Sequence, residues 1–384
     1  MRHNYIWYMQ QIPMVDLVGQ YNKIKSEVDA SIQEVLSTAG FIGGPFVKKF
    51  QEDLQEYLGV KHVIPCANGT DALQVAMMGL GLEPGDEVIT TSFTFIATAE
   101  IVALLRLKPV VVDVEPDTYC IDPAAVERAI TPRTKAIVPV HLFGQCANMD
   151  AIMDIARRHN LYVVEDNAQA IGAHYTFKDG TVKKSGTIGN VGCTSFFPSK
   201  NLGCYGDGGA LFTDDDTLAE MLRCVVNHGM KERYYHDYVG VNSRLDAIQA
   251  AVLDIKLKHL DEYIAARQYA AAYYDEAFAK TEHIVTPVHP AFTDHVYHQY
   301  VVVLKDVDRA GLMAHLQSKG IASAIYYPVP LHMQKAYADP RYKQGDFPVC
   351  EYLCDHVVAL PIHTEFTDEQ LKYVTDSVLE FVER

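Results

Sequence analysis

Two segments near the start of the chain repeat apolar residues at helical spacing. The apolar positions are Ile24, Val28, Ile32, Val35 and Leu36 in the first segment and Phe46, Phe50, Leu54 and Leu58 in the second. This spacing predicts two amphipathic helices. Pro45 suits the first turn of the second helix, and Gly59 suits its C-terminal stop.

After residue 60, short apolar runs alternate with helical segments. The runs HVIPC, EVITT, PVVVDV, KAIVPV and YVVED are rich in β-branched residues and apolar on both faces. Such runs are typical of strands that helices cover on both sides. Helices are expected from Asp71 and through ATAEIVALL, so the pattern predicts an α/β fold with a mostly parallel sheet.

The pattern changes after Arg244, because the chain then runs to residue 280 without Pro or Gly. We expect one long helix there that leaves the main domain. The remainder contains the strands YHQYVVVL and IASAIYY and the helices DRAGLMAHLQSKG and TDEQLKYVTDSVLEFVER. The sequence thus predicts a large domain over residues 1–255, with an N-terminal helical segment over 1–60, and a smaller α+β domain over 256–384.

The composition is that of a soluble globular protein, with 384 residues, 49% hydrophobic and 21% charged. A net charge of -16 argues against nucleic acid or an anionic membrane as a partner, since both require a basic patch. No run approaches the roughly 18 apolar residues of a membrane span. The opening MRHNYIWYMQQIP is too short and polar for a signal-peptide core, and Met9 is an alternative natural start. We therefore expect a cytoplasmic protein.

Eight cysteines are scattered along the chain, and none forms a CxxC pair. This pattern favours a reducing compartment over a disulfide framework or a zinc ribbon. Cys350 and Cys354 lie one helical turn apart near His356, but buried apolar cysteines explain that spacing more simply than zinc does. We expect no metal site.

The stretch CTSFFPSKNLGCYGDGGA places Lys200 between a strand-like run and a glycine-rich segment. A lysine among apolar neighbours loses hydration, which lowers its pKa and leaves a nucleophilic free amine. Ser195 and Ser199 stand beside it. The surrounding glycines leave room for a ligand to approach closely.

Three other features belong with this lysine. Asn68, Gly69 and Thr70 lie between HVIPC and the helix expected from Asp71, where they could form a phosphate cradle or a simple turn and N-cap. Asp166 ends YVVED, where it could pair with a cationic ring nitrogen or cap the next helix. Phe93 and Phe95 could lie on a planar cofactor or pack in the core. Phosphate cradle, carboxylate, flat aromatic and reactive lysine are together the parts that pyridoxal 5'-phosphate (PLP) needs.

The motifs CANGTDAL, PGDEVIT, FTFIATAE, VEDNAQAIGA, SFFPSKNLGCYGDGGA and VGVNSRLDAIQAA resemble those of the DegT-type nucleotide-sugar aminotransferases. The resemblance extends from about Ile12 to past Pro361. It implies an aspartate-aminotransferase-like fold (fold type I) with a seven-stranded sheet, PLP as cofactor, and a homodimer that shares its active sites.

The resemblance also assigns cofactor contacts. They are Lys200 as the Schiff-base lysine, Asp166 at the pyridine nitrogen, Gln169 near the phenolic oxygen, Phe95 on the ring, Gly69, Thr70 and Ser195 at the phosphate, and Asn242 reaching the phosphate from the neighbouring subunit.

The longest matching runs resemble the branch that moves an amino group from glutamate to C3 of a UDP-linked 2-acetamido-3-oxo-glucuronic acid, for surface polysaccharide or lipopolysaccharide. In that branch Arg244 and the pair before PVPL contact the sugar. The pair is Tyr326–Tyr327 here and His-Tyr in the relatives, which leaves a dTDP- or UDP-linked 3-keto or 4-keto-6-deoxy sugar as an alternative. Further candidate substrate contacts are His141, His228, His298 and His332, each with a structural role equally open.

Three rival functions are weighed against this one. PLP-dependent sugar dehydratases resemble the lysine motif but carry His in place of Lys200. A cysteine desulfurase-like enzyme needs a reactive thiol on a mobile loop, and Cys204 sits instead in the glycine-rich segment. A non-catalytic sensor or regulatory protein needs a DNA-binding segment or a damaged site, and the sequence shows neither.

Overall fold

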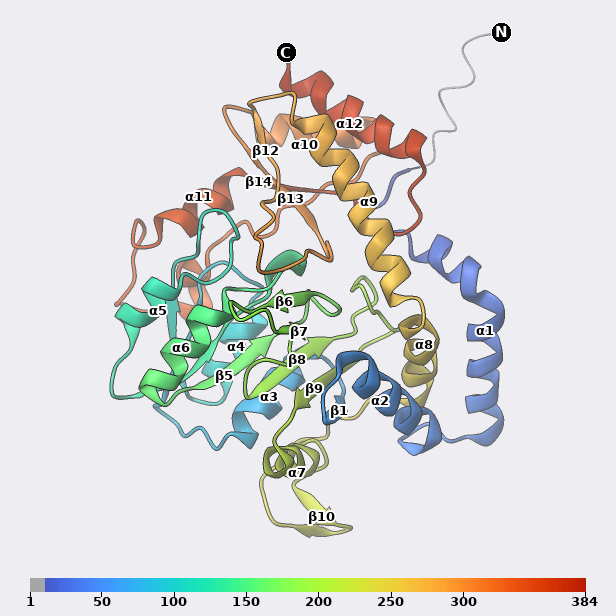
Figure 1. The fold of residues 1–384 in the computed structure, drawn as a ribbon, viewed down its shortest axis with the longest axis vertical. Coiled ribbons are helices and arrows are strands. Elements are labelled where there is room, and N and C mark those ends of the chain that lie inside the picture. Colours follow the sequence, from blue (N-terminus) through green and yellow to red (C-terminus); the bar gives the residue numbers. More distant parts are fainter. Residues whose placement is uncertain (1–10) are drawn as a thin grey trace.

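The computed structural model describes residues 11–384, so the questions of a signal peptide and of Met9 as the start fall outside the described residues. Both N-terminal helices are confirmed as α1 (Leu17–Thr38) and α2 (Gly44–Leu58). Pro45 lies in the first turn of α2. Gly59 ends it in the left-handed conformation, with φ 68°. Both helices pack against α8 (Ala247–Leu257) (Figure 1).

A seven-stranded sheet forms the centre of the molecule, in the order β1-β9-β8-β5-β4-β2-β3. Its strands are β1 (His62–Cys66), β2 (Glu87–Thr91), β3 (Lys108–Val112), β4 (Thr134–Val138), β5 (Tyr162–Asp166), β8 (Val191–Ser195) and β9 (Gly209–Thr213). β9 is antiparallel to both of its neighbours, and the pairs from β8 to β3 are parallel. The predicted fold class is confirmed.

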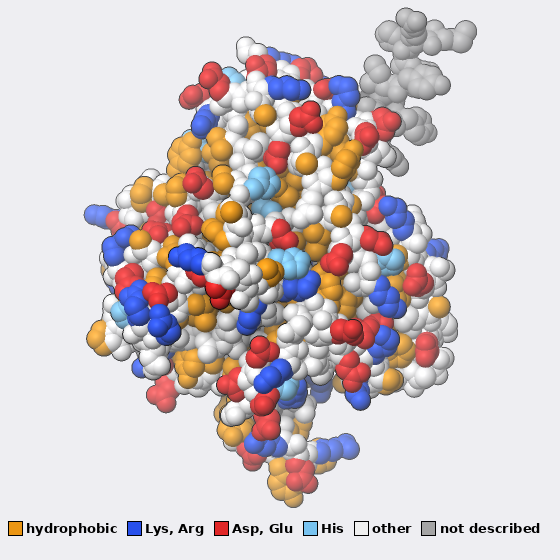
Figure 2. Space-filling model, viewed as in Figure 1, with side chains coloured by type: hydrophobic (Ala, Val, Ile, Leu, Met, Phe, Trp, Pro, Cys, Tyr) orange, Lys and Arg blue, Asp and Glu red, His pale blue; other side chains and the backbone are white. Residues whose placement is uncertain are grey.

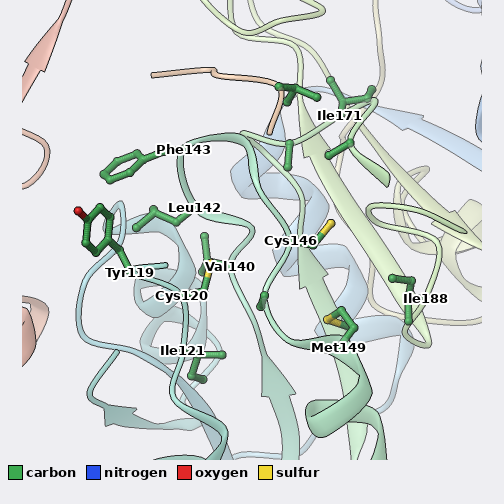
Figure 3. Packing of buried hydrophobic residues seen from close by; sticks show 14 of the residues in the cluster. Tyr119, Cys120, Ile121, Val140, Leu142, Phe143, Cys146, Met149, Ile171 and Ile188 are labelled. Carbon is green, nitrogen blue, oxygen red and sulfur yellow. The ribbon is translucent and has the colours of Figure 1, made fainter. Parts of the chain in front are cut away.

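Helices cover both faces of this sheet, which explains why its strands are apolar on both sides. On one face lie α3 (Gly69–Gly79), α4 (Ala97–Leu104) and α7 (Asp216–Val225), around Leu73, Ile101 and Leu222. On the other face lie α2, α5 (Pro123–Ala129), α6 (Met149–His159) and α8. Figure 3 shows part of the second core, where Leu142 and Phe143 follow β4 and lie beside Tyr119.

A three-stranded antiparallel sheet forms the smaller unit. It contains β12 (Ile284–Val285), β13 (Tyr300–Leu304) and β14 (Val357–Leu360), with α9 (Leu260–Phe278), α10 (Arg309–Ser318), α11 (Pro348–His356) and α12 (Asp368–Val382) around it. Ile12 joins this unit through a bridge to Ile321. The chain's first described residues therefore pack with its last third.

Two predicted elements differ from the structure. The prediction of a single long helix is wrong, because residues 258–259 interrupt the helix and separate α8 from α9. Leu257 and Leu260 on either side of the break are both buried in the core, so packing outweighs helix propensity there. The prediction of a strand over residues 321–327 is also wrong. Only Ile321 and Ala324 form isolated bridges, and the rest of the segment carries Tyr326 and Tyr327 to a cavity described below.

The remaining elements of the described residues are two hairpins and three short 3-10 helices. They are β6 (His174–Thr176) with β7 (Val182–Lys184), β10 (Met230–Glu232) with β11 (Tyr235–His236), η2 (Leu142–Gly144), η3 (Leu331–Met333) and η4 (Lys335–Tyr337). The β10 hairpin projects beyond α7 at the edge of the molecule (Figure 1). Among the described residues visible in Figure 2, acidic and basic side chains are interspersed. No helix in the described part of the chain is long and apolar enough to cross a membrane.

All eight cysteines are buried and free. Residues 11–384 contain no cluster of three or more His, Cys, Asp or Glu side chains that could bind a metal ion. Cys350 and Cys354 lie in α11, in the core between the two sheets.

Candidate active site

A cavity of about 660 Å³ opens at the carboxyl ends of the parallel strands, where open α/β sheets bind their ligands. Loops after β2, β4, β5 and β8 line it, together with the start of α3 and two segments of the smaller unit. Its lining residues include Gly69, Thr70, Phe95, Asp166, Gln169, Ser195, Lys200, His298, Gln299, Tyr326 and Tyr327. The structure therefore brings together most of the residues that the sequence singled out.

Lys200 follows β8 through a tight turn, in which its N–H donates to the carbonyl of Phe197 (2.8 Å). A side chain at Gly203 would come within 2.4 Å of the Pro198 carbonyl, so this turn requires glycine. Burial lowers the pKa of the Lys200 amine to about 8, although the charge of Asp166 opposes the shift. The prediction of an amine with a lowered pKa at this position matches the structure.

Asp166 ends β5 and is buried at the floor of the cavity. The Thr98 hydroxyl donates to one carboxylate oxygen (2.7 Å), and the N–H of Ala168 donates to the other (3.2 Å). Burial raises the pKa of the carboxyl, while Thr98 and the charge of Lys200 act in the opposite direction. A cationic partner in the cavity would favour the ionised form, as a protonated ring nitrogen does.

His141 has a structural role beneath Asp166. Its Nε2 lies 2.8 Å from the Glu165 carboxylate, and its Nδ1 accepts from the N–H of Ala147 (3.2 Å). Both side chains are fully buried. Glu165 also accepts from the N–H groups of Ile188 and Gly189, so this pair fixes the end of β5 and does not face the cavity.

The start of α3 and the end of β8 lie close together at the position where the sequence predicts a phosphate cradle. Asn68 caps α3 by accepting from the N–H of Asp71 (2.8 Å), which leaves the first N–H groups of the helix for an anion. Thr70 and Ser195 add two hydroxyls that line the cavity. A Cβ atom at Gly69 would lie 2.6 Å from the Cβ of Ser195, so only glycine allows the helix to approach β8 this closely.

Replacing Gly69 tests the predicted phosphate cradle directly. We expect Gly69→Ala to push α3 away from β8, to raise the dissociation constant for PLP at least about tenfold, and to lower the free energy of unfolding by about 1–3 kcal/mol. Equilibrium dialysis and urea unfolding measure the two effects. Gly40→Ala is the matched control, because its Cβ meets nothing closer than Thr38 Oγ1 at 3.5 Å. Equal effects of the two changes would contradict the cradle.

The two phenylalanines after β2 lie in different environments. Phe93 is fully buried in the core, whereas Phe95 is 55% exposed and lines the cavity. Gln169 accepts from the N–H of Phe143 (2.7 Å) and donates to the Tyr327 hydroxyl (2.9 Å). An accessible ring, a fixed amide and a half-buried phenol thus line one cavity, whose donors suit a phosphorylated pyridine.

Other candidates lie outside the cavity of this chain. Asn242 and Arg244 are exposed before α8, and His228 is exposed at the base of the β10 hairpin. His332 lies in η3, where its ring nitrogens contact Ser92 (2.9 Å) and Glu351 (3.1 Å). Its position gives the predicted substrate contact no support, because both nitrogens have partners within the fold.

Cys204 does not have the properties of a reactive thiol. Its Sγ donates to the carbonyls of Phe196 and Gly206, and burial raises its pKa to about 11. A thiol that stays protonated is a poor nucleophile. The structure therefore disfavours the desulfurase-like alternative.

Residues 22–379 match the DegT/DnrJ/EryC1/StrS aminotransferase family. The chain belongs to this family. The predicted family is confirmed, and so is its PLP cofactor, since this is a family of PLP-dependent enzymes. The protein is an aminotransferase, and several of its relatives are named as aminotransferases of nucleotide-linked sugars.

Three curated relatives of this aminotransferase show which functions are assigned to similar proteins. It is 48% identical to UDP-2-acetamido-2-deoxy-3-oxo-D-glucuronate aminotransferase of Pseudomonas aeruginosa, over 94% of this chain and 98% of the relative. It is 46% identical to the pleiotropic regulatory protein of Geobacillus stearothermophilus (96% and 98%). It is 44% identical to UDP-N-acetyl-3-dehydro-alpha-D-glucosamine 3-aminotransferase of Acidithiobacillus ferrooxidans (94% and 95%).

Two solved structures share the whole fold of this aminotransferase. DesV of Streptomyces venezuelae, in complex with a ketimine intermediate, has a TM-score of 0.93 and 42% identity, and covers 98% of this chain and 100% of its own. NtdA of Bacillus subtilis, with bound cofactor PMP, has a TM-score of 0.89 and 31% identity, over 98% and 86%.

Proposed function

We propose that this aminotransferase moves the amino group of L-glutamate to C3 of a UDP-linked 2-acetamido-3-oxo sugar, with the glucuronate as the first candidate. The observation that carries the proposal is the agreement between two relatives. The Pseudomonas and Acidithiobacillus enzymes, at 48% and 44% identity, both bear names of UDP-linked sugars with a keto group at C3. We further propose that the product enters surface polysaccharide synthesis in the cytoplasm.

The chain's own residues supply positioning and proton transfer. PLP, when bound, supplies an aldehyde that condenses with amines and a ring that accepts electrons from the substrate carbon. Asp166 would keep the ring nitrogen protonated, and the N-terminus of α3 with Thr70 and Ser195 would bind the phosphate. The Lys200 amine, once free, would act as the base that accepts the proton from the donor's Cα and as the acid that donates it again. Phe95, Tyr326 and Tyr327 shield this proton transfer from water.

A homodimer is part of the proposal. Asn242 and Arg244 are exposed and lie outside the cavity of their own chain. A second copy, related by two-fold symmetry, would bring these side chains to the phosphate and the sugar. Light scattering of the purified protein tests the dimer. Mixing an Asn242→Ala chain with a Lys200→Ala chain tests sharing, because one intact site per heterodimer should restore activity.

A regulatory function is the second candidate, because one relative at 46% identity is named a pleiotropic regulatory protein. This chain keeps Lys200, Asp166 and the glycine, threonine and serine of the predicted cradle in one cavity, which favours catalysis. The deciding experiment has two steps. The PLP form is first treated with glutamate, and the resulting amino form is then offered a panel of 3-keto and 4-keto sugars linked to UDP or dTDP. Mass spectrometry identifies any aminated product.

The panel has a clear outcome for each function. Amination of the UDP-linked 3-oxo-glucuronate in preference to the 4-keto sugars supports the proposal. Preference for a dTDP-linked sugar selects the alternative substrate. A protein that binds PLP but releases no 2-oxoglutarate from glutamate would leave only the regulatory candidate.

The lowered pKa of Lys200 predicts how cofactor uptake depends on pH. A pKa of about 8 instead of 10.5 gives roughly 300 times more free amine at neutral pH. The rate of covalent PLP uptake by the cofactor-free protein should rise about tenfold per pH unit below 8 and level off above it. Stopped-flow absorbance measures that rate. A rise that continues to about pH 10 would show an ordinary lysine.

A further inference from the structure

The segment just before β13 reaches into the active-site cavity from the smaller unit. His298 and Gln299 both line the cavity. His298 is only 7% exposed. Its Nδ1 atom and the Oε1 atom of Gln299 are buried without a hydrogen-bond partner among the described residues. Buried polar atoms are nearly always paired, so two unpaired atoms on adjacent cavity residues point to a ligand.

Hydrogen bonds from two loops fix this segment. The side chain of Asn201, next to Lys200, donates to the carbonyl of Val296 (2.7 Å). The N–H of Val296 donates to the carbonyl of Gly144 (2.8 Å), and the N–H of Gln299 donates to that of Phe143 (3.2 Å). The segment is therefore joined to the loops after β4 and β8, which also line the cavity.

Two further features hold the backbone of the segment in place. Buried Arg267 donates to the carbonyls of Tyr297 (3.0 Å) and His298 (3.3 Å). A Cβ atom at Gly144 would lie 2.9 Å from the nitrogen of His298, so a glycine is needed at this approach. A backbone fixed this tightly holds its polar side chains ready for a ligand.

The imidazole of His298 is neutral. Burial lowers its pKa well below the usual value, and the charges of Lys200 and Arg267 act in the same direction. A neutral imidazole with a protonated Nδ1 is a donor there, and the Gln299 carbonyl oxygen is an acceptor. Together they complement a group that both accepts and donates one hydrogen bond.

A sugar hydroxyl is such a group. The carboxylates of glutamate only accept hydrogen bonds, and its ammonium only donates them. Among the described residues that line the cavity, Lys200 is the one Lys or Arg, whereas Asp71, Asp166 and Asp207 are acidic. The surroundings of His298 therefore suit a neutral hydroxyl better than a second carboxylate.

We propose that His298 and Gln299 together bind a hydroxyl group of the sugar substrate and so select the acceptor in the second half of the reaction. This assignment rests on the proposed function, since it concerns the keto sugar that the enzyme aminates. It makes the segment before β13 a specificity element that does not take part in the glutamate half-reaction.

The test measures the two half-reactions separately in His298→Phe, which keeps a ring but removes its nitrogens. With UDP-2-acetamido-2-deoxy-3-oxo-glucuronate, kcat/KM should fall about 10- to 100-fold. The glutamate half-reaction should stay within about twofold of wild type. The cofactor-free variant should melt at or above the wild-type temperature, because an unpaired buried nitrogen has been removed. His298→Asn, which restores an N–H donor, should recover part of the lost rate.

A matched control comes from His363, which is also buried and whose Nε2 also has no hydrogen-bond partner within residues 11–384. It does not line the cavity, so His363→Phe should leave both half-reactions unchanged. Gln299→Leu should lower the sugar half-reaction, and the double variant His298→Phe/Gln299→Leu should lose less than the product of the two single losses, since both residues bind one group.

The outcomes are distinct. Equal losses in both half-reactions, or no loss with the sugar, would overturn the role of His298. Multiplicative losses in the double variant would overturn the shared hydroxyl. If wild type prefers another sugar of the panel, the same measurements use that sugar. If wild type reacts with glutamate but aminates no sugar of the panel, the proposed function fails and the hydroxyl contact fails with it.

Discussion

Lys200→Ala should lower the rate of amino transfer by about ten-thousand-fold or more, because it removes both the covalent attachment and the proton-transfer group. The variant should still bind PLP through the cradle and Asp166, but without the visible absorbance of the covalently bound cofactor. Absorbance spectra and single-turnover kinetics with glutamate measure both effects.

A more deeply buried lysine makes this test specific. Lys256 in α8 is almost fully buried, burial lowers its pKa to about 8 as it does for Lys200, and it donates to the carbonyl of Gly203 (2.8 Å). It does not line the cavity. Borohydride reduction of the wild-type protein should therefore fix PLP on residue 200 alone. Peptide mapping that finds the label on residue 256 would contradict the assignment, as would Lys200→Ala with near-normal turnover.

Asp166→Asn should lower kcat about 100- to 1,000-fold, since it removes the negative partner of a buried cation. Thr98→Val is the matched control, because it removes only the hydroxyl that donates to Asp166. A single hydrogen bond to a charged group is worth about 1.5–3 kcal/mol, so the control should lose less. An Asp166→Asn enzyme no slower than Thr98→Val would show that the ring nitrogen needs no anion.

Asp166→Asn should impair catalysis but should not lower the unfolding free energy of the cofactor-free protein. Burial raises the pKa of Asp166, so its ionised form is disfavoured in the folded state and Asn removes that cost. Asp166→Asn should match or exceed the wild-type unfolding free energy at neutral pH. The difference in unfolding free energy between Asp166→Asn and wild type should narrow as the pH falls, because the carboxyl then becomes protonated in both the folded and the unfolded chain. Urea unfolding across pH measures the trend, and a less stable variant would contradict it.

The sequence predicted those elements whose local pattern decides their structure. The β-branched runs became parallel strands because helices bury both of their faces. Pro45 and Gly59 bound α2 through local backbone preferences. Lys200, Asp166, Gly69 and Phe95 met at one cavity because the carboxyl ends of parallel strands share an edge.

Features that depend on distant contacts escaped prediction. Nothing in the local pattern shows that β9 inserts antiparallel between β1 and β8, or that buried leucines interrupt a run of good helix formers. The sequence offered His332 as a substrate contact but could not reveal Ser92 and Glu351 as its partners. The sequence left His298 open between a structural and a substrate role, and Gln299 was missed because no motif precedes β13. Its one signal is a polar pair, His-Gln, directly before a fully apolar strand.

The enclosure of all eight thiols gives the protein a set of internal reporters. An alkylating reagent dissolved in water can reach a sulfur atom only when the surrounding structure opens. Cys66 and Cys193 lie in the central sheet, whereas Cys350 and Cys354 lie in α11. The order in which these sites become alkylated in dilute denaturant would record, region by region, how the molecule comes apart.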